Sequence, residues 1–580
     1  MASRNNSVPQ PHEDSSDNHD PRHLDKLEKG SIAPSESSVA HREDQHGVLT
    51  GSSDGLQRHL SNRQVQLICL GASIGTAIFV SIGGTLHNAG PGNLFLAFLI
   101  HNVVVSMVNN SMAEMSVYMP VSGGFIRLAG KWVDDALGFV AGWNFFAFQA
   151  ILIPFEITAL SLVLSFWSDH IPVGAICGAC IILYALLNVF AVRIYGEAEF
   201  YLSSGKAFLL FLLFSFTFVT MVGGNPQHDA YGFRNWKSPG AFRAYLSEGD
   251  LGKFEGFLAA LWSAAFTCVG PEYVSIVAAE AKHPRVYVKT AYKAVYWRLF
   301  AFFVGSALAC GILVPADDPT LAAAFGAGAD SEHSGSPTSS PYVIAMSNMG
   351  VSVLPHIVTA LLATTIFSAG NTYTYCATRT LYGLSLEGRA PKVLQKVTGK
   401  GIPIYCFCIV MLFPFLSLLQ MSSSSAAVLG WLINLCTATI GITFVIISVT
   451  YIAFHRACRA QNFDRSTLPY KGWFQPYAAW FSLAWMFVIE VCYGYASFSP
   501  FNVVNFVTSY LLLLLSPALF LFWKYFKGTT IVKAKDVDLI WDAPLISAYE
   551  EALPERPTGF WREVGQYFRI LKPRSQQHSS

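Results

Sequence analysis

The sequence predicts an all-α polytopic membrane protein with twelve transmembrane helices. Three observations support this: charged residues are scarce, long apolar stretches recur, and Lys and Arg gather in alternate loops. The 580 residues are 52% hydrophobic and 13% charged, whereas soluble domains carry roughly 25% charged residues. Of the 75 charges, 43 lie in residues 61–523, about 9% of that stretch. A water-facing surface needs charge nearly everywhere, so a soluble globular protein is excluded.

The composition excludes other classes as well. Intrinsic disorder of the whole chain is incompatible with its apolar content, and a net charge of +1 offers no surface for a polyphosphate, so no nucleic acid is expected as a partner. All 11 Cys lie in or at the ends of apolar stretches, which argues against a disulfide scaffold. The CxxC of Cys177 and Cys180 lies inside an apolar run and is interpreted as packing.

Three regions follow from the charge distribution. Residues 1–60 are polar and rich in Ser, His and Asp, which predicts a disordered cytoplasmic tail. Residues 61–526 form the transmembrane domain, and residues 527–580 form a cytoplasmic C-terminal tail. Stretches long enough to cross a bilayer core of about 30 Å are expected at roughly 64–90, 92–118, 137–167, 172–192, 201–224, 257–281, 296–315, 342–380, 402–420, 426–454, 477–497 and 502–526.

The connecting loops predict the orientation. One set of loops carries seventeen Lys and Arg, and the other carries four, all of them in the loop 225–256. Because cytoplasmic loops are enriched in Lys and Arg, the first set is expected in the cytoplasm together with both termini. The seventeen are Arg127, Lys131, Arg193, Lys282, Arg285, Lys289, Lys293, Arg298, Arg379, Arg389, Lys392, Lys396, Lys400, Arg456, Arg459, Arg465 and Lys471.

Elimination leaves secondary transport. The sequence has no Gly-x4-Gly-Lys-Ser/Thr phosphate loop, which argues against an ATP-driven pump. The 15 His are scattered, so neither a membrane enzyme nor a metal or other cofactor is expected. No ion-selectivity filter is recognisable.

Two apolar stretches carry signs of interruption. The first contains Ser73, Gly75, Thr76 and Ala77 in Gly-Ala-Ser-Ile-Gly-Thr-Ala-Ile-Phe, and the sixth contains Phe266-Thr-Cys-Val-Gly-Pro-Glu-Tyr. In transporters built from repeats, broken helices at matching positions form the substrate site. A helix that restarts after a break directs N–H groups at an anion, and the carbonyl groups before the break attract a cation, so such a site suits a zwitterion. The alternative is that Gly75 only permits close packing and that the proline only kinks its helix.

From these breaks the substrate-binding residues are predicted. The carboxylate is expected at Gly75, Thr76 and Ala77, with Ser73 nearby. The ammonium is expected near the carbonyl group of Val269. Gly270 belongs to the second break, and Phe266 and Trp431 are candidate gates, although packing is the ordinary role of an aromatic residue.

Six ordered blocks of this sequence resemble fungal amino-acid permeases of the amino acid–polyamine–organocation superfamily, nearest the dicarboxylic and general amino acid permease branch. They are GASIGTAIF, AEMSVYMPVSGGF, GWNFF with PFEITALSLVLSFW, YGEAEFYLSSGK, FSAGNTYTYCATRTLYGLSLEGRAPK and RACRAQNFDRSTLPYKGWFQPY. The resemblance covers nearly all of 60–530. It implies a leucine-transporter-like fold of five-plus-five inverted spans, with helices one and six broken, and proton-coupled uptake of amino acids across the plasma membrane.

The resemblance leaves the substrate open. The sixth span has VGPEY where the family form is closer to SGTEL, and GNPQHDAYGFRNWKSPGAF looks most like the branch associated with acidic amino acids. A dicarboxylate would favour an added Arg or Lys in the cavity, and none is evident beyond Lys206. Acidic, neutral and broad specificity, and proline, remain open.

Ionisable residues at membrane depth are functional candidates by default. Glu156 follows Pro154 in the third span and is expected to bind a proton or the substrate ammonium. Glu272 directly follows the second break and is expected to face the cavity. Glu114 is interpreted as either functional or a structural cap for the loop Pro-Val-Ser-Gly-Gly-Phe, and Glu490 is a further buried candidate.

Lys206 has two interpretations. It lies near the cytoplasmic end of the fifth span, where lysine side chains can reach water. The resemblance instead implies the lysine that, in related proton-coupled carriers, replaces a sodium ion beside the broken first helix. Lys206, Glu272 and Glu156 are therefore the predicted proton-coupling groups.

Other polar residues on interior spans are candidates for the cavity lining or for contacts between helices. They are Asn371, Thr372, Asn434 and Thr437. Lys26 and Lys29 in the N-terminal tail are candidate ubiquitin sites for endocytosis, as in similar permeases. Residues 539–570 mix aromatic and charged side chains, a composition that can lie on a membrane surface.

The interpretation is a symporter for amino acids and protons that works by alternating access. One alternative is a transporter-like amino-acid sensor. Another is a carrier for choline or polyamines, which would not need the carboxylate-binding break that GASIGTAIF predicts.

Overall fold

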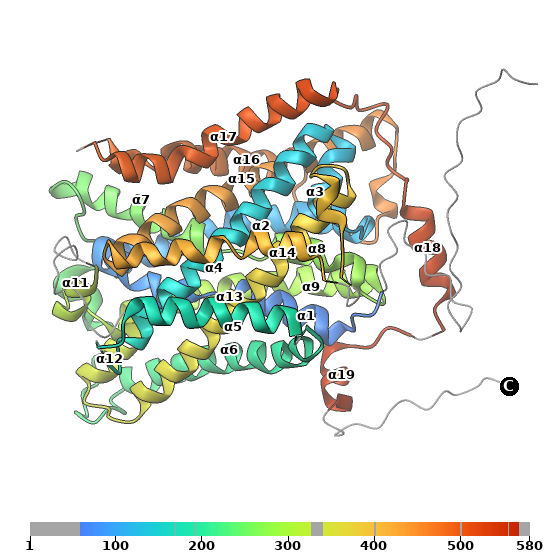
Figure 1. Ribbon diagram of the computed structural model, residues 1–580. Coiled ribbons are helices and arrows are strands. Elements are labelled where there is room, and N and C mark those ends of the chain that lie inside the picture. Colours follow the sequence, from blue (N-terminus) through green and yellow to red (C-terminus); the bar gives the residue numbers. More distant parts are fainter. Residues whose placement is uncertain are drawn as a thin grey trace, which may run out of the picture. The chain divides into compact units, whose positions relative to one another are not determined.

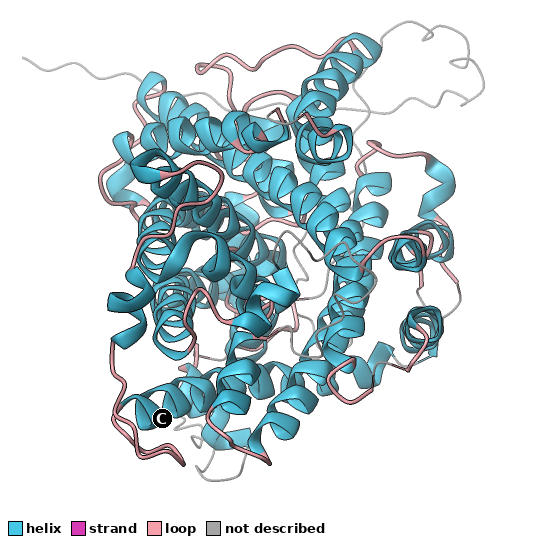
Figure 2. Cartoon of the chain, turned by 90° about the vertical axis from the view of Figure 1, so that its left-hand side faces the viewer, coloured by secondary structure: helices cyan, strands magenta, loops and turns pink. Residues whose placement is uncertain are grey.

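The computed structural model describes residues 58–168, 170–190, 192–325, 340–398, 402–498, 501–554 and 556–567. Within these ranges every regular element is a helix, and β pairing is limited to two isolated bridges (Figure 2). The all-α prediction is thus confirmed for this part of the chain. Lys26 and Lys29 lie outside the described residues.

The first part of the chain supplies the helices around the two breaks (Figure 1). They are α1 (Asn62–Ser73), α2 (Ser81–Tyr118), α3 (Gly124–Trp132), α4 (Asp135–Leu164), α5 (Val173–Phe190), α6 (Val192–Met221), α7 (Gly249–Thr267), α8 (Pro271–Val277), α9 (Pro284–Arg298) and α10 (Gly305–Leu313).

The second part of the chain supplies the remaining helices. Its helices are α11 (Pro319–Phe325), α12 (Pro341–Asn348), α13 (Leu354–Leu386), α14 (Ile404–Val410), α15 (Ser425–Ala460), α16 (Tyr477–Cys492), α17 (Val503–Lys527), α18 (Ala543–Ala552) and α19 (Phe560–Tyr567).

The core is organised around α4 and α2. Helix α4 packs along α13 and α15, and α2 packs along α7. Nearly every residue of α4 from Ala136 to Ser161 is buried, as expected for a helix that is apolar all round. Among the described residues, ten helical segments are long and apolar enough to cross a membrane, so the protein is a multi-pass membrane protein.

Three local features differ from the expected spans. The boundary between the first two spans is a kink at Gly90 (φ 80°), and α2 continues through it. The span expected at 342–380 is two helices, α12 and α13, because Gly350 adopts φ +74° between them. The loop expected at 316–340 contains the short helix α11, and the Asp318 carboxylate accepts hydrogen bonds from the first N–H groups of this helix.

The interpretation of Glu114 as a cap for the loop after α2 is wrong. Its buried carboxylate accepts hydrogen bonds from Arg465 Nε and Nη2 (2.8 and 2.9 Å), from the Tyr451 hydroxyl (3.0 Å) and from Gly472 N–H (2.8 Å). These donors surround the carboxylate, so it anchors the loop between α15 and α16 to the end of α2. Asn110, one turn earlier, accepts from Trp473 N–H and donates to the Trp473 carbonyl.

The C-terminal segment packs on the protein. Arg285 N–H donates to the Glu550 carboxylate at 2.9 Å, and the Arg285 guanidinium donates to Ser547 at 2.8 Å. Glu563 of α19 accepts from the backbone N–H groups of Asn62 (3.4 Å) and Arg63 (2.7 Å) at the start of α1. Figure 1 shows α18, which these contacts of Arg285 place beside the start of α9. Glu550 and Glu563 of this segment therefore serve contacts within the chain, whereas Trp561 is 81% exposed. The expectation that residues 539–570 lie on a membrane surface stays a prediction.

Gly124 is expected to tolerate no side chain. It begins α3 with φ +49°, and a Cβ there would lie 2.5 Å from the Ser275 carbonyl oxygen of α8. Backbone strain and overpacking together predict that Gly124→Ala destabilises the protein by about 2–4 kcal/mol. The measurement is the apparent melting temperature of the purified full-length protein.

The control for this variant is Gly350→Ala. Gly350 also has a positive φ (+74°), but the space around its Cβ position is open, so only the strain of about 1 kcal/mol applies. Equal melting temperatures for the two variants would contradict the close approach of α3 to α8.

Candidate functional site

The first break lies between α1 and α2. Helix α1 ends at Ser73, and Gly75 is extended (φ −95°, ψ 179°). A single turn, η1 (Thr76–Ile78), follows before α2 starts at Ser81. Little surrounds the position of a Cβ atom on Gly75. The nearest atom to it is the hydroxyl oxygen of Tyr373, 3.7 Å away.

The second break separates α7 from α8. Gly270 adopts φ 157° and ψ −46°, and Pro271 is the first residue of α8. Proline suits this position because the first N–H groups of a helix lack intrahelical partners. A Cβ on Gly270 would lie 3.9 Å from the Cβ of Ser73, so the two breaks lie against each other.

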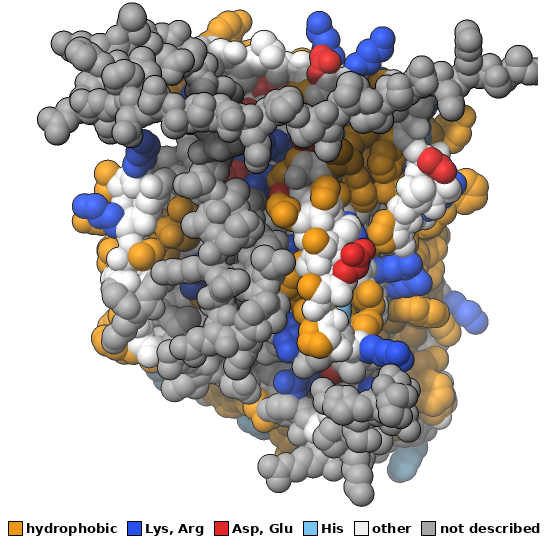
Figure 3. Space-filling model, turned by 90° about the vertical axis from the view of Figure 1, so that its right-hand side faces the viewer, with side chains coloured by type: hydrophobic (Ala, Val, Ile, Leu, Met, Phe, Trp, Pro, Cys, Tyr) orange, Lys and Arg blue, Asp and Glu red, His pale blue; other side chains and the backbone are white. Residues whose placement is uncertain are grey.

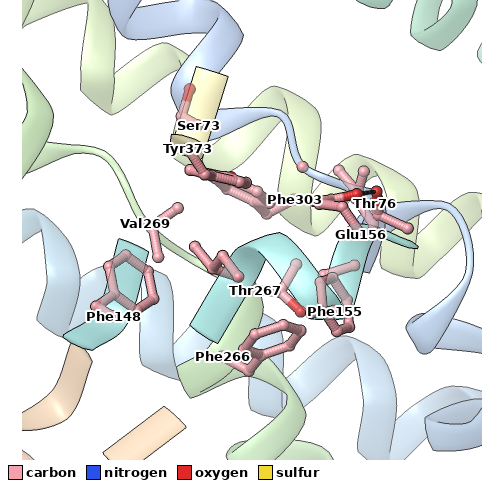
Figure 4. Close-up of a pocket in the computed structure, with 14 residues that line it drawn as sticks. Ser73, Thr76, Phe148, Phe155, Glu156, Phe266, Thr267, Val269, Phe303 and Tyr373 are labelled. Atoms are coloured by element: carbon pink, nitrogen blue, oxygen red, sulfur yellow. Dashed lines mark hydrogen bonds between the residues drawn. The ribbon is translucent and has the colours of Figure 1, made fainter. Parts of the chain in front are cut away.

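A cavity opens beside these breaks (Figure 4). Its empty volume is about 360 Å³, counting the part open to solvent. Four groups of residues line it: the first break, one face of α4, the second break, and single residues from η4 (Leu299–Val304) and α13. They are Ser73, Gly75, Thr76, Ala77, Ile78, Phe148, Leu152, Phe155, Glu156, Phe266, Thr267, Val269, Phe303 and Tyr373.

Glu156 is the only Asp, Glu, His, Lys or Arg among these lining residues. Its side chain is 1% exposed, and its carboxylate accepts a hydrogen bond from the Thr76 hydroxyl (Figure 4). A charged group in an apolar interior is costly unless it is hydrogen-bonded or paired. This contact therefore joins α4 to the first break through a single polar pair.

Lys206 lies at the other side of the first break. The residue is fully buried, and Nζ donates a hydrogen bond to the Gly71 carbonyl at 3.1 Å, in the last turn of α1. Its ammonium therefore does not reach the surface. The residue does not belong to the cavity lining, but its charge lies close enough to interact electrostatically with Glu156, which does line the cavity.

Glu272 is placed differently from expectation. Both of its carboxylate oxygens accept from Gly270 N–H, at 3.1 and 3.2 Å, and the residue is fully buried. An acidic side chain in the first turn of a helix can fold back onto the preceding backbone N–H in this way. The carboxylate thereby stabilises the second break, and neither Glu272 nor Gly270 lines the cavity.

The polar candidates on α13 and α15 also lie outside the lining. Asn371 Oδ1 accepts from Asn188 Nδ2 at 2.9 Å, and the Thr437 hydroxyl donates to the Ile433 carbonyl at 2.7 Å. Asn434 bonds to the Tyr493 hydroxyl at 2.8 Å. The Thr372 hydroxyl donates to the Ser368 carbonyl at 2.9 Å.

Several lining residues were not expected from the sequence, mainly aromatic and aliphatic ones. Tyr373 brings its hydroxyl to Gly75 from α13. Phe148, Leu152 and Phe155 have the i, i+4, i+7 spacing of one helix face, a signal that marks the face but not what it faces. Phe303 lies in η4 and has no sequence signal of its own.

Comparisons with known proteins agree with this architecture. The family described as Amino acid permease matches residues 64–535. The general amino acid permease AGP2 of Saccharomyces cerevisiae is 43% identical over 477 residues, covering 81% of this chain and 79% of the relative. The proline-specific permease of the same yeast is 34% identical, covering 88% and 82%, and its dicarboxylic amino acid permease is 32% identical, covering 89% and 85%.

A solved transporter structure shows the same fold. The manganese transporter of Eremococcus coleocola aligns with a TM-score of 0.50 at 13% identity, over 84% of this chain and 94% of that one. The family match covers most of the chain, and relatives above 30% identity span four fifths or more of it. This chain is therefore a member of the amino acid permease family.

Proposed function

We propose that this protein is a secondary active transporter that imports amino acids across the plasma membrane together with protons, by alternating access. One observation carries the proposal: two helix breaks lie against each other beside a cavity that contains one buried carboxyl group, Glu156. Paired broken helices at a central site are the device by which such carriers bind zwitterions. The membership of the amino acid permease family supports the same substrate class.

In this proposal the substrate lies between the two breaks. Its carboxylate accepts hydrogen bonds from backbone N–H groups at Gly75, Thr76 and Ala77, where a helical segment restarts. Its ammonium lies near the Val269 carbonyl and the Glu156 carboxylate. Phe266, which packs edge-on against Phe155 with ring centroids 5.2 Å apart, closes the cavity beside the substrate.

Proton coupling is assigned to Lys206 and Glu156. Lysine can exist charged or neutral according to its surroundings. A change in the protonation of Lys206 would alter its hydrogen bond to the Gly71 carbonyl and so affect the end of α1. Glu156 can carry a proton when the substrate ammonium is absent. Four predicted substrate-binding residues lie outside the cavity lining: Glu272, Gly270, Asn371 and Thr437. Their roles in substrate binding therefore stay predictions.

The architecture proposed for this mechanism has twelve spans, a transmembrane domain at 61–526 and cytoplasmic tails at 1–60 and 527–580. Its first ten spans form a leucine-transporter-like five-plus-five repeat, in which the breaks occupy helices one and six. The cation-rich loops support the orientation, because Arg285 and Arg127 both contact the C-terminal segment. Lys and Arg side chains are visible on the face that carries this segment (Figure 3).

The test is uptake into liposomes that contain the purified full-length protein. An outside-acid gradient is expected to drive labelled amino acids above equilibrium, and a protonophore should collapse this accumulation. Uptake that is equal with and without the proton gradient would refute symport. Uptake of choline or spermidine without any amino acid would favour the organic-cation carrier, and binding without uptake would favour a sensor.

A further inference from the structure

The charges around the cavity restrict the side chain of the substrate. Among the fourteen lining residues there is no Lys, Arg or His, and Glu156 is the only carboxylate. The buried lysine of the mechanism, Lys206, lies outside the lining, donates to the Gly71 carbonyl and interacts electrostatically with Glu156, whose negative charge already balances it. A second carboxylate on the substrate would therefore find no further cationic side chain in the lining, and burying it unpaired is costly.

The hydroxyl groups of the lining offer little to a polar side chain. Ser73 Oγ donates to the Leu70 carbonyl at 3.1 Å, and Thr267 Oγ1 donates to the Ser263 carbonyl at 2.7 Å. The Thr76 hydroxyl donates to Glu156. These three donors are already used within the protein. The fourth hydroxyl of the lining, that of Tyr373, lies beside Gly75, so all four lie at the breaks, where the backbone of the substrate is placed.

The remaining walls are apolar. Phe148, Leu152 and Phe155 present one face of α4, and Phe266 and Phe303 come from two other segments. Figure 4 shows the rings of Phe148 and Phe266 away from the Thr76–Glu156 contact and the ring of Phe155 nearer to it. A pocket of this kind gains binding energy from an apolar side chain and offers a charged one no partner.

We infer that the substrate is an amino acid with an uncharged, apolar side chain, and that acidic and cationic amino acids are excluded by the lining. This inference rests on the proposed function and narrows it. Glu156 cannot serve a cationic side chain as well, because it is already shared between Thr76 and the substrate ammonium. Of the substrates that the sequence leaves open, the inference selects the apolar amino acids, including proline, over the acidic ones.

The experiment measures uptake and binding by the full-length protein with three labelled probes: leucine, glutamate and lysine. Leucine is expected to be taken up, and excess unlabelled phenylalanine should compete with it. Glutamate and lysine should compete at least about tenfold less well, the smallest discrimination expected from a mismatched pocket. Competition by glutamate or lysine that equals competition by phenylalanine would overturn the inference.

A thermal-shift assay with the same three amino acids separates this inference from the proposed function. Stabilisation by leucine alone, without uptake, would support the apolar pocket and refute transport. Stabilisation by none of the three, together with no uptake, would refute both. Uptake of glutamate would refute only the inference.

Two variants of one lining residue localise the effect. Leu152→Asn keeps a similar size but adds polarity, and it is expected to raise the leucine concentration for half-maximal uptake by about tenfold. Leu152→Met conserves both volume and apolar character and should stay within about threefold of the unaltered protein. An equal effect of both substitutions, at unchanged melting temperature, would show that leucine does not contact this wall.

Discussion

Lys206→Met is expected to abolish accumulation of the substrate against its gradient while leaving the protein folded. The methionine is similar in length and apolar, so it fits the buried site, but it can neither carry a proton nor donate to the Gly71 carbonyl. A membrane potential of about 100 mV can drive about 50-fold accumulation of a substrate carried with one charge. The variant should lose this factor and equilibrate its substrate instead.

The measurement compares net accumulation with exchange of labelled for unlabelled substrate in liposomes. Exchange needs binding and alternation but no net proton movement, so it should survive in Lys206→Met. Lys206→Arg is the matched variant, because arginine keeps the charge but does not deprotonate; it too should fail to accumulate. Lys289→Met removes a lysine that donates to the Pro469 carbonyl at 2.8 Å, away from the cavity, and should accumulate normally. Accumulation by Lys206→Met would refute the assignment.

Arg465→Ala is expected to destabilise the protein by about 3–5 kcal/mol, the usual result of removing one partner of a buried ion pair. Glu114 is fully buried, and Arg465 supplies two of the hydrogen bonds to its carboxylate. The remaining donors, Tyr451 and Gly472, cannot neutralise the charge. The measurement is the apparent melting temperature of the purified full-length protein.

Two controls accompany this prediction. Arg234 pairs with Asp229 at 2.7 Å, but both side chains are well exposed, so Arg234→Ala should not shift the melting temperature measurably. The double variant Arg465→Met with Glu114→Gln removes both charges and should recover part of the lost stability. A double variant as unstable as Arg465→Ala would show that the ion pair is not the cause.

The sequence predicts the two breaks because their causes are local. The Gly270–Pro271 pair disfavours a continuous helix because proline has no N–H group, and Gly75 weakens the helix around it. The long apolar runs likewise predict the membrane region, because the hydrocarbon layer imposes a length on each span. The break at Gly350 is not predicted by the sequence, because a single glycine within an apolar run is also compatible with a continuous helix.

The lining of the site is less predictable because it depends on how each helix is rotated. Asn371 and Tyr373 lie two residues apart on α13, yet only Tyr373 lines the cavity. Asn371 was the expected lining residue because it is polar, but its side-chain oxygen accepts a hydrogen bond from Asn188 of α5 instead. Glu272 was expected to face the cavity because it directly follows the second break. In the structure its carboxylate instead accepts a hydrogen bond from the nearby Gly270 N–H. Glu114 and Arg465 are 351 residues apart, and no local pattern joins them.

The contact between α19 and α1 has a consequence for the order of events during synthesis. Glu563 accepts from Arg63 N–H across 500 residues of sequence. The start of α1 is made first, but this acceptor for its N–H groups is made only after every helix of the membrane region. Because chains are synthesised from the N-terminus, α1 must be inserted and held by other partners until the ribosome has finished with α19. The contact is thus among the last that the newly made protein completes.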